Sequence, residues 1–294
     1  MPPDEPSWWY RADAGFAGNA LAPAAALYGW AAKTRFALGK PYRSRLPVLC
    51  VGNFTAGGTG KTPLSVYLCE RIQALGRTPV VLTRGYGGRM RGPHFVAQTD
   101  TALDVGDEPL LLARHARVVV SRDRADGARR IEAIADAGVI VMDDGLQNPE
   151  LVKDLVVAVV DGARAFGNGR VIPAGPLRAP LAFQLELADI IVVNASAAVG
   201  GEGIAAKLKG TFNGPVLRCT TLPAGDSSWL AGQRIVAWAG IGAPERFFSM
   251  LAALDASIVE RITFPDHHVL TTEDAQRLLQ IAQHQQAVRE KPRR

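Results

Sequence analysis

The chain alternates short, almost uninterrupted apolar runs with longer segments of mixed polarity. Five such runs are rich in valine, isoleucine and leucine: residues 48–52, 79–84, 118–121, 139–142 and 155–161. Helices are predicted between them, at residues 63–75, 110–113 and 126–136. Strands that are apolar on both faces and separated by helices are typical of a parallel sheet with helices on both sides. The pattern therefore predicts an α/β fold whose ligands bind at the carboxyl ends of the strands.

The second half of the chain also alternates predicted strands and helices, over fewer elements. Residues 162–180 are rich in glycine, proline and arginine, and we expect a linker or a ligand-facing loop there. The later elements are predicted strands at 190–194, 215–218, 234–242 and 257–264, and predicted helices at 244–254 and 272–288. Thr271 or Thr272 suits the cap of the last helix. We therefore predict one domain at 46–164 and a second, smaller α/β domain at 165–294 that completes the cleft.

The N-terminal segment, residues 1–45, is predicted to be helical and has a different pattern. No charged residue occurs from Ala14 to Ala32, a length close to that of a membrane-spanning helix. The stretch is rich in alanine and glycine, is interrupted by Pro23, and has aromatic residues around it and basic residues after it. This combination favours a helix in the headgroup region of a membrane, with packing against the rest of the chain as the alternative. A membrane span is the least favoured interpretation, and the acidic start argues against a secretory signal.

Composition limits the classes of function without selecting one. The 294 residues include 48% hydrophobic ones, enough for a substantial core, and the formal net charge is +5. That charge suits nucleic acid, an anionic membrane surface or a phosphorylated substrate. The basic residues lie in predicted loops and in the N-terminal segment and form no dedicated nucleic-acid-binding module. This distribution argues against nucleic acid as a partner. The 3 cysteines are scattered, so we expect free thiols and no structural zinc.

The most informative stretch joins the first predicted strand to the first predicted helix. Within a few residues it contains three glycines, followed by Lys61 and Thr62. Glycines let backbone N–H groups surround an anion, the helix N-terminus and the lysine add positive charge, and the threonine hydroxyl suits Mg²⁺. The stretch departs from the general phosphate-binding (P-loop) pattern at Thr55, where glycine is expected. A glycine-rich turn with a solvated lysine is the alternative, but the context favours a P-loop in a nucleotide-binding domain.

Carboxylates occur at further element ends. Asp143 and Asp144 close the strand at 139–142, where a carboxylate can hold Mg²⁺ directly or through water. Asp107 and Glu108 lie at a predicted helix start, where they either cap the helix or serve a site. The Asp-His-His sequence at 266–268 suits a proton relay better than a metal pair. Phosphoryl transfer needs a metal clamp, cations for the phosphate oxygens and a group that takes the acceptor's proton, and the sequence offers each of these.

These motifs, in this order, resemble those of the tetraacyldisaccharide 4′-kinases of lipid A biosynthesis in Gram-negative bacteria. The resemblance runs nearly end to end, and the joint order of the motifs is more specific than any one of them. The stretches that carry it are 51–53 with 57–63, 83–87, 105–109, 122–124, 143–145, 167–169 with 173–178, and 264–268.

The resemblance implies a peripheral enzyme at the cytoplasmic face of the bacterial inner membrane. Such an enzyme moves the γ-phosphoryl group of ATP, with Mg²⁺, to the 4′-hydroxyl of a tetraacylated glucosamine disaccharide 1-phosphate, which gives lipid IVA. The implied partners are this acylated lipid substrate and an anionic membrane surface, and no obligate protein partner is evident.

The resemblance also assigns roles to individual residues. Asp107 is implied as the base or positioning group for the acceptor hydroxyl, aided by His267 across the cleft, with Lys61 as the third catalytic residue. Thr62, Asp143 and Asp144 are implied at the metal. The residues implied to bind the nucleotide or line the site are Thr55, Gly57, Gly58, Thr59, Gly60, Lys61, Thr62, Glu108, Arg122, Gln147 and Arg178. The family's own P-loop has threonine where this chain has Thr55.

Two positions depart from the family pattern. Asn148 stands where the family usually has histidine, and Ala179 stands where it tends to have a glutamate that could help bind Mg²⁺. These departures leave two alternatives open, a catalytically weakened P-loop protein that binds nucleotide and a regulatory NTPase. No Asn-Lys-x-Asp sequence for reading guanine occurs, which counts against a GTPase.

Overall fold

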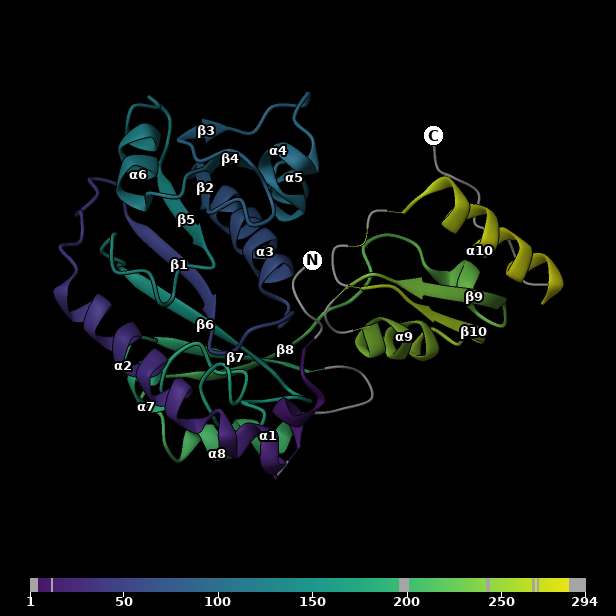
Figure 1. The fold of residues 1–294 in the computed structure, drawn as a ribbon. Helices are drawn as coiled ribbons and strands as arrows, with labels where there is room; N and C mark the ends of the chain where they lie inside the picture. Colours follow the sequence, from purple (N-terminus) through teal and green to yellow (C-terminus); the bar gives the residue numbers. More distant parts are fainter. Residues whose placement is uncertain are drawn as a thin grey trace.

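The computed structural model describes residues 5–11, 13–195, 201–241, 244–265, 268 and 270–285. An eight-stranded sheet forms its centre, in the order β3-β4-β2-β5-β1-β6-β7-β8 (Figure 1). The strands are β1 (Val48–Asn53), β2 (Pro79–Thr83), β3 (His94–Phe95), β4 (Arg117–Val120), β5 (Val139–Asp143), β6 (Leu155–Asp161), β7 (Ile190–Ala195) and β8 (Val216–Thr220). Neighbouring strands are parallel except β3 with β4. The predicted α/β fold with a mostly parallel sheet is confirmed.

Side chains alternate between the two faces of this sheet, as the period of a strand requires. Cys50 of β1 belongs to one buried cluster, and its neighbour Val51 belongs to another. The first cluster is covered by α6 (Arg124–Glu132), α7 (Leu181–Glu186) and α8 (Glu202–Lys209). The second is covered by α3 (Lys61–Ala74) and α5 (Asp107–Leu112), the latter preceded by the short α4 (Ala102–Val105). Burial on both faces explains why the strands are almost uninterrupted apolar runs.

The N-terminal segment packs beside α7. It comprises a 3₁₀ turn, η1 (Ser7–Tyr10), and the helices α1 (Gly15–Ala20) and α2 (Ala22–Leu38) (Figure 1). The buried residues of α2 are the small Ala25 and Gly29, and Phe36 packs edge-to-face on Phe183 of α7 at a centroid distance of 5.5 Å. Packing against the rest of the chain therefore occurs, along a narrow edge of α2. Across the described residues, each helix is too short or too polar to cross a bilayer.

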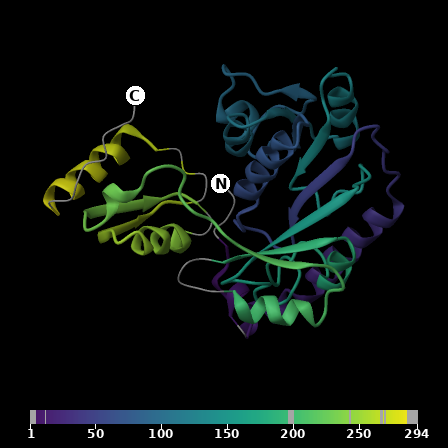
Figure 2. The ribbon, with the colours of Figure 1, turned by 180° about the vertical axis from the view of Figure 1, so that it is seen from behind.

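A second unit follows β8 and lies beside the central sheet (Figure 2). It begins with η2 (Ser228–Leu230) and contains a separate two-stranded parallel sheet, β9 (Arg234–Ala239) with β10 (Ser257–Thr263). The helices α9 (Pro244–Ala253) and α10 (Thr272–His284) pack on this sheet. Phe248 of α9 belongs to a buried cluster of its own. Thr271 caps α10 as predicted, because its side chain accepts a hydrogen bond from the N–H of Asp274.

The predicted domain boundary between residues 164 and 165 does not match the sheet. It falls between β6 and β7, which are hydrogen-bonded neighbours in which Asp161 is the register partner of Asn194. Residues 162–180, for which we expect a linker or a ligand-facing loop, agree with the second alternative: this stretch folds back on the P-loop, where the N–H of Ala56 donates to Pro176 O at 2.8 Å. The central sheet therefore includes strands that the sequence assigned to the smaller domain.

Candidate active site

The P-loop connects β1 to α3 at the carboxyl edge of the central sheet. Its backbone passes through left-handed conformations at Gly57 and Gly60, with φ of 91° and 89°, which strongly favour glycine. Thr55 is buried and pairs with Leu177 through an isolated antiparallel bridge. A strand-like contact at this position explains why threonine replaces the glycine of the general pattern.

A buried carboxylate ends β5 beside the P-loop. Asp143 Oδ1 accepts a hydrogen bond from Ser65 Oγ of α3 at 2.9 Å, and no described group donates to its Oδ2. Burial, reinforced by the charges of Glu108 and Asp144, raises the pKa of Asp143 to about 7. This carboxyl therefore favours protonation unless a cation approaches it.

The next residue, Asp144, is surrounded by cations. Arg178 Nη1 lies 2.9 Å from its Oδ2, and Lys61 Nζ lies 3.6 Å from its Oδ1. Arg178 also donates from Nε to Thr55 O at 3.1 Å, so it joins the carboxylate to the P-loop. Burial opposes ionisation of Asp144, but Arg178 and Lys61 outweigh it and lower the pKa of that carboxyl. The pKa of Asp143 is thus raised and the pKa of the adjacent Asp144 is lowered, so Asp144 stays charged.

The start of α5 brings further carboxylates to the same edge. Thr62 Oγ1 lies 3.4 Å from Glu108 Oε1, so Glu108 reaches the P-loop threonine. Asp107 is the first residue of α5 and is exposed. Gly106 precedes it with a φ of 91°, and any side chain there would collide with Tyr86 O. This glycine lets the start of α5 approach the turn after β2.

Gln147 and Arg122 differ in their relation to the P-loop. Gln147 Nε2 donates to Asn53 O at 2.7 Å and to Gln184 Oε1 at 2.6 Å, so its amide supports the end of β1. Arg122 is exposed, and its described hydrogen bonds go to the turns at Gly88 and Arg91. Those described contacts do not join Arg122 to the P-loop.

The Asp-His-His stretch is only partly described. Asp266 and His267 lie outside the described residues, so the role of His267 stays a prediction. His268 stacks on Phe264 with a centroid distance of 4.6 Å, and its Nε2 lies 2.9 Å from Asp274 Oδ2. Since Asp274 also completes the capping box of α10, His268 ties this stretch to α10.

The structure gathers most of the predicted site residues at one edge of the sheet. They are Thr55, Gly57, Gly58, Thr59, Gly60, Lys61, Thr62, Glu108, Asp143, Asp144, Gln147 and Arg178. Several buried oxygens here accept or donate no hydrogen bond within the described structure: Asn53 Oδ1, Thr59 Oγ1, Asp143 Oδ2 and Asp144 Oδ1. Buried polar atoms normally have partners, so these oxygens are available to water or to a polar ligand.

The carboxylates at this edge suit a metal that arrives with its substrate. In the described part of the chain, His, Cys, Asp and Glu side chains form no group of three or more that could hold a metal ion alone. Mg²⁺ in phosphoryl-transfer sites is bound by one or two carboxylates together with substrate phosphates and water. Asp143 Oδ2 and Asp144 Oδ1, which accept no hydrogen bond within the described structure, fit that requirement.

Three polar residues near the P-loop were not predicted as site residues. Ser65 bonds Asp143, Asn194 Nδ2 donates to Thr59 O at 3.1 Å, and Arg246 lies close to Gly60. Asn194 could have been identified, because it stands near the carboxyl end of the apolar run of β7. Ser65 and Arg246 lie within helices, and no local pattern distinguishes them.

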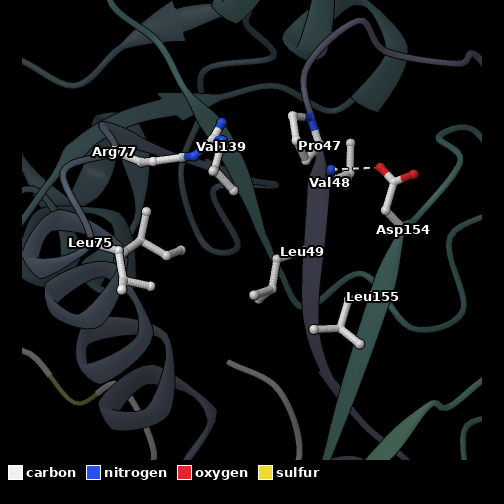
Figure 3. A pocket seen from close by; sticks show the side chains of 9 residues that line it. Pro47, Val48, Leu49, Leu75, Arg77, Val139, Asp154 and Leu155 are labelled. Atoms are coloured by element: carbon white, nitrogen blue, oxygen red, sulfur yellow. Dashed lines mark hydrogen bonds between the residues drawn. The ribbon is translucent and has the colours of Figure 1, made fainter.

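Two surface hollows lie away from this edge. One, of about 270 Å³, lies at the amino ends of β1, β5 and β6 (Figure 3). Apolar side chains line most of it (Pro47, Val48, Leu49, Ile72, Leu75, Val139 and Leu155), together with Arg77 and Asp154. The other, of about 370 Å³, lies between α1, α2 and residues 170–180. Neither hollow includes a P-loop residue. The candidate site is therefore identified by the P-loop backbone and by its charged side chains, and neither hollow marks it.

Comparisons with known proteins agree on one family. A sequence model of the family described as Tetraacyldisaccharide-1-P 4′-kinase matches residues 17–291. A Tetraacyldisaccharide 4′-kinase from Bradyrhizobium sp. strain BTAi1 is 47% identical over 285 residues, which cover 96% of this chain and 81% of the relative. Another from Methylorubrum extorquens strain PA1 is 49% identical over 267 residues, covering 90% and 79%.

A solved structure agrees with these sequence relatives. The crystal structure of LpxK from Aquifex aeolicus in complex with ATP is 26% identical and has a TM-score of 0.70, covering 86% of this chain and 83% of that one. The motifs, the fold and the sequence relatives agree on the family. This chain belongs to the tetraacyldisaccharide 4′-kinase family.

Proposed function

We propose that this chain transfers the γ-phosphoryl group of ATP to the 4′-hydroxyl of a tetraacylated glucosamine disaccharide 1-phosphate, giving lipid IVA. The observation that carries the proposal is the convergence of a P-loop and a carboxylate pair, in which Lys61 lies 3.6 Å from Asp144. The names of the relatives support the acceptor. The ATP complex of the Aquifex aeolicus relative supports the nucleotide.

The phosphates of ATP would lie in the P-loop. Backbone N–H groups of its glycine-rich turn and the N-terminus of α3 favour anions there. Lys61, only 8% exposed, adds a full positive charge in a shielded place. Arg178 has a planar fork suited to phosphate oxygens, and its bonds to Thr55 O and Asp144 hold that fork at the edge of the loop.

Mg²⁺ would be held by Thr62, Asp143 and Asp144 together with phosphate oxygens. When bound, the ion neutralises negative charge on the transferred phosphoryl group. Asp143 is kept in place by Ser65 on one oxygen, which leaves the other oxygen for the metal or its water. Glu108, beside Thr62, can supply the carboxylate charge that Ala179 lacks.

Asp107 would accept the proton of the 4′-hydroxyl or orient that hydroxyl. Its exposed position at the start of α5 leaves it accessible to a substrate approaching the P-loop edge. His267 is proposed as its partner from the second unit. The two positions that depart from the family pattern have supporting places in the fold. Asn148 bonds Glu150 at 2.9 and 3.2 Å, so it supports the loop after β5, and Ala179 is fully buried.

The N-terminal helices would rest on an anionic membrane surface at the cytoplasmic face of the inner membrane. Large apolar side chains remain exposed on α1 and α2: Phe16, Leu27, Tyr28, Trp30 and Leu38. Basic residues follow them along the chain. Apolar and aromatic side chains beside basic ones favour an interfacial position, where an acylated substrate would also lie.

The test is transfer of labelled γ-phosphate from Mg·ATP to tetraacyldisaccharide 1-phosphate in mixed micelles. Lys61→Ala and Asp107→Ala should each lower turnover by about a hundredfold or more, because each removes a group that acts on the reacting phosphate or hydroxyl. Lys209→Ala, which changes an exposed lysine at the end of α8, should leave turnover unchanged. Absence of product while ATP still binds would instead favour a weakened nucleotide-binding protein.

A further inference from the structure

Arg246 of α9 reaches from the second unit to the carboxyl edge of the central sheet. Its Nη2 lies 3.0 Å from Asp161 Oδ2 and donates to Asn194 O at 3.1 Å. Asp161 and Asn194 are register partners on β6 and β7. One guanidinium group therefore joins the ends of two adjacent strands.

The ion pair between Arg246 and Asp161 is shielded from solvent, and further hydrogen bonds fix the orientation of the Asp161 carboxylate. The side chains of Arg246 and Asp161 are 22% and 6% exposed. The second oxygen of Asp161, Oδ1, accepts hydrogen bonds from the backbone N–H groups of Ala163 and Arg164 at 2.8 and 3.1 Å. Removing one partner of a shielded, hydrogen-bonded pair has a larger effect than breaking an exposed one.

Asn194 connects this pair to the P-loop. Its side chain is buried, and Nδ2 donates to Thr59 O at 3.1 Å while Oδ1 accepts from Thr221 Oγ1 at 3.3 Å. A side chain at Gly60 would collide with the Asn194 amide and lie 3.4 Å from Arg246 Nη1. Asn194 thus bonds Thr59 and lies against Gly60, the two P-loop residues that precede Lys61, and Arg246 in turn bonds Asn194 O.

We propose that Arg246 is a positioning residue for nucleotide binding. It holds Asn194 against the carbonyl of Thr59 and so fixes the P-loop from the second unit, without touching the reacting atoms. The planar guanidinium bonds a carboxylate and a carbonyl at once, which the point charge of a lysine reproduces only in part. This inference rests on the proposed function and adds to it a residue from the far end of the chain.

The test compares Arg246→Gln, Arg246→Lys, Asp161→Asn and the double variant Arg246→Gln/Asp161→Asn. ATP affinity is measured by calorimetry on the full chain, and KM and kcat are measured in the micelle assay. Arg246→Gln should weaken ATP binding and raise KM for ATP by about tenfold. KM for the lipid acceptor should not change, and Arg246→Lys should recover part of the loss.

Two comparisons distinguish a positioning role of Arg246 from a general loss of structure. Because Arg246 and Asp161 act as one pair, the double variant should bind ATP no more weakly than Arg246→Gln alone. Arg218→Gln, which breaks an exposed pair with Glu202 (47% and 79% exposed), should leave ATP affinity unchanged. Thermal unfolding of each variant verifies that it folds. If Arg246→Gln does not fold, the ATP affinities of Arg246→Lys and Asp161→Asn show whether the ion pair positions the P-loop.

The inference is overturned if folded Arg246→Gln binds ATP within about twofold of the unsubstituted protein. It is also overturned if the loss of ATP binding free energy in the double variant equals the sum of the losses in the two single variants. Failure of the proposed function is a different result. In that case the unsubstituted protein transfers no phosphate to the lipid, whereas ATP binding by the variants still tests Arg246.

Discussion

Asp143 is a buried carboxyl whose titration affects stability. Burial, with Glu108 and Asp144 nearby, raises its pKa from 3.8 to about 7. A carboxyl whose pKa is raised on folding favours the folded state while protonated, so its contribution is fully present below the unfolded pKa and is lost as pH rises through 7. In metal-free buffer, Asp143→Asn should therefore raise the free energy of unfolding at pH 8 by up to about 4 kcal/mol and have little effect near pH 4.

The measurement is thermal unfolding of both proteins with EDTA across this pH range. A difference in Tm that stays constant with pH would contradict the prediction, because it would show that Asp143 does not titrate on unfolding.

Arg178 makes two directed bonds that a lysine cannot reproduce together. Its Nε and Nη1 bond Thr55 O and Asp144 Oδ2 at 3.1 and 2.9 Å. Arg178→Lys keeps the charge but loses the fork, so ATP affinity should fall by about tenfold. Calorimetry with Mg·ATP measures this, and Arg117→Lys, in an exposed pair with Asp136, is the matched control. Equal affinities for both variants would show that the P-loop needs only a positive charge there.

Site residues could be predicted where the local pattern carries a signal. Lys61 follows a glycine-rich turn, and Asp143 ends an apolar run, so both were identified from the sequence. Arg246 could not be, because its role arises from contact with Asp161 and Asn194, which lie far away along the chain. A single sequence does not reveal such pairings between distant segments.

At the scale of elements, α2 presents two different faces. Ala25 and Gly29 are buried, while Leu27 and Trp30 are each 64% exposed. Fully burying an apolar side chain contributes roughly 1.5–3 kcal/mol, so Leu27→Asp with Trp30→Asp should weaken binding to anionic phospholipid vesicles by at least about tenfold. Because both side chains are exposed in the folded chain, Tm should change little.

Vesicle sedimentation measures this binding. Leu75→Asp is the matched control, since Leu75 is 80% exposed at the end of α3, away from α2. Unchanged binding of the double variant would leave packing against α7 as the whole role of α2.

Element positions could be predicted more accurately than element ends. The helix predicted at 63–75 begins at Lys61, because the P-loop lysine already has helical backbone. The helix predicted at 126–136 spans Arg124–Glu132, because Asp123 caps it by accepting from the N–H of Asp126. The two-residue β3 was not predicted, since it is too short to show a period.

For the whole molecule, the division into units was the least predictable feature. Composition changes sharply at residues 162–180, but β7 and β8 return to the central sheet after this stretch. Sheet membership depends on pairing between strands, and glycine and proline content does not report it. We propose that the boundary lies between the end of β8 at Thr220 and the start of η2 at Ser228.

Separate apolar cores make that boundary testable. Phe248 is 1% exposed within the cluster of the second unit, and Ile131 is fully buried in the cluster under the central sheet. Phe248→Ala should cost about 3–5 kcal/mol and Ile131→Ala about 2–5 kcal/mol, each in its own unit. Hydrogen exchange followed by mass spectrometry should show faster exchange in β9 and β10 for the first variant and in β2 and β4 for the second. Faster exchange throughout the chain in both variants would mean that the two units unfold together. In that case the contact of Arg246 with β6 and β7 would be part of one cooperative structure, and the chain would have a single domain with two sheets.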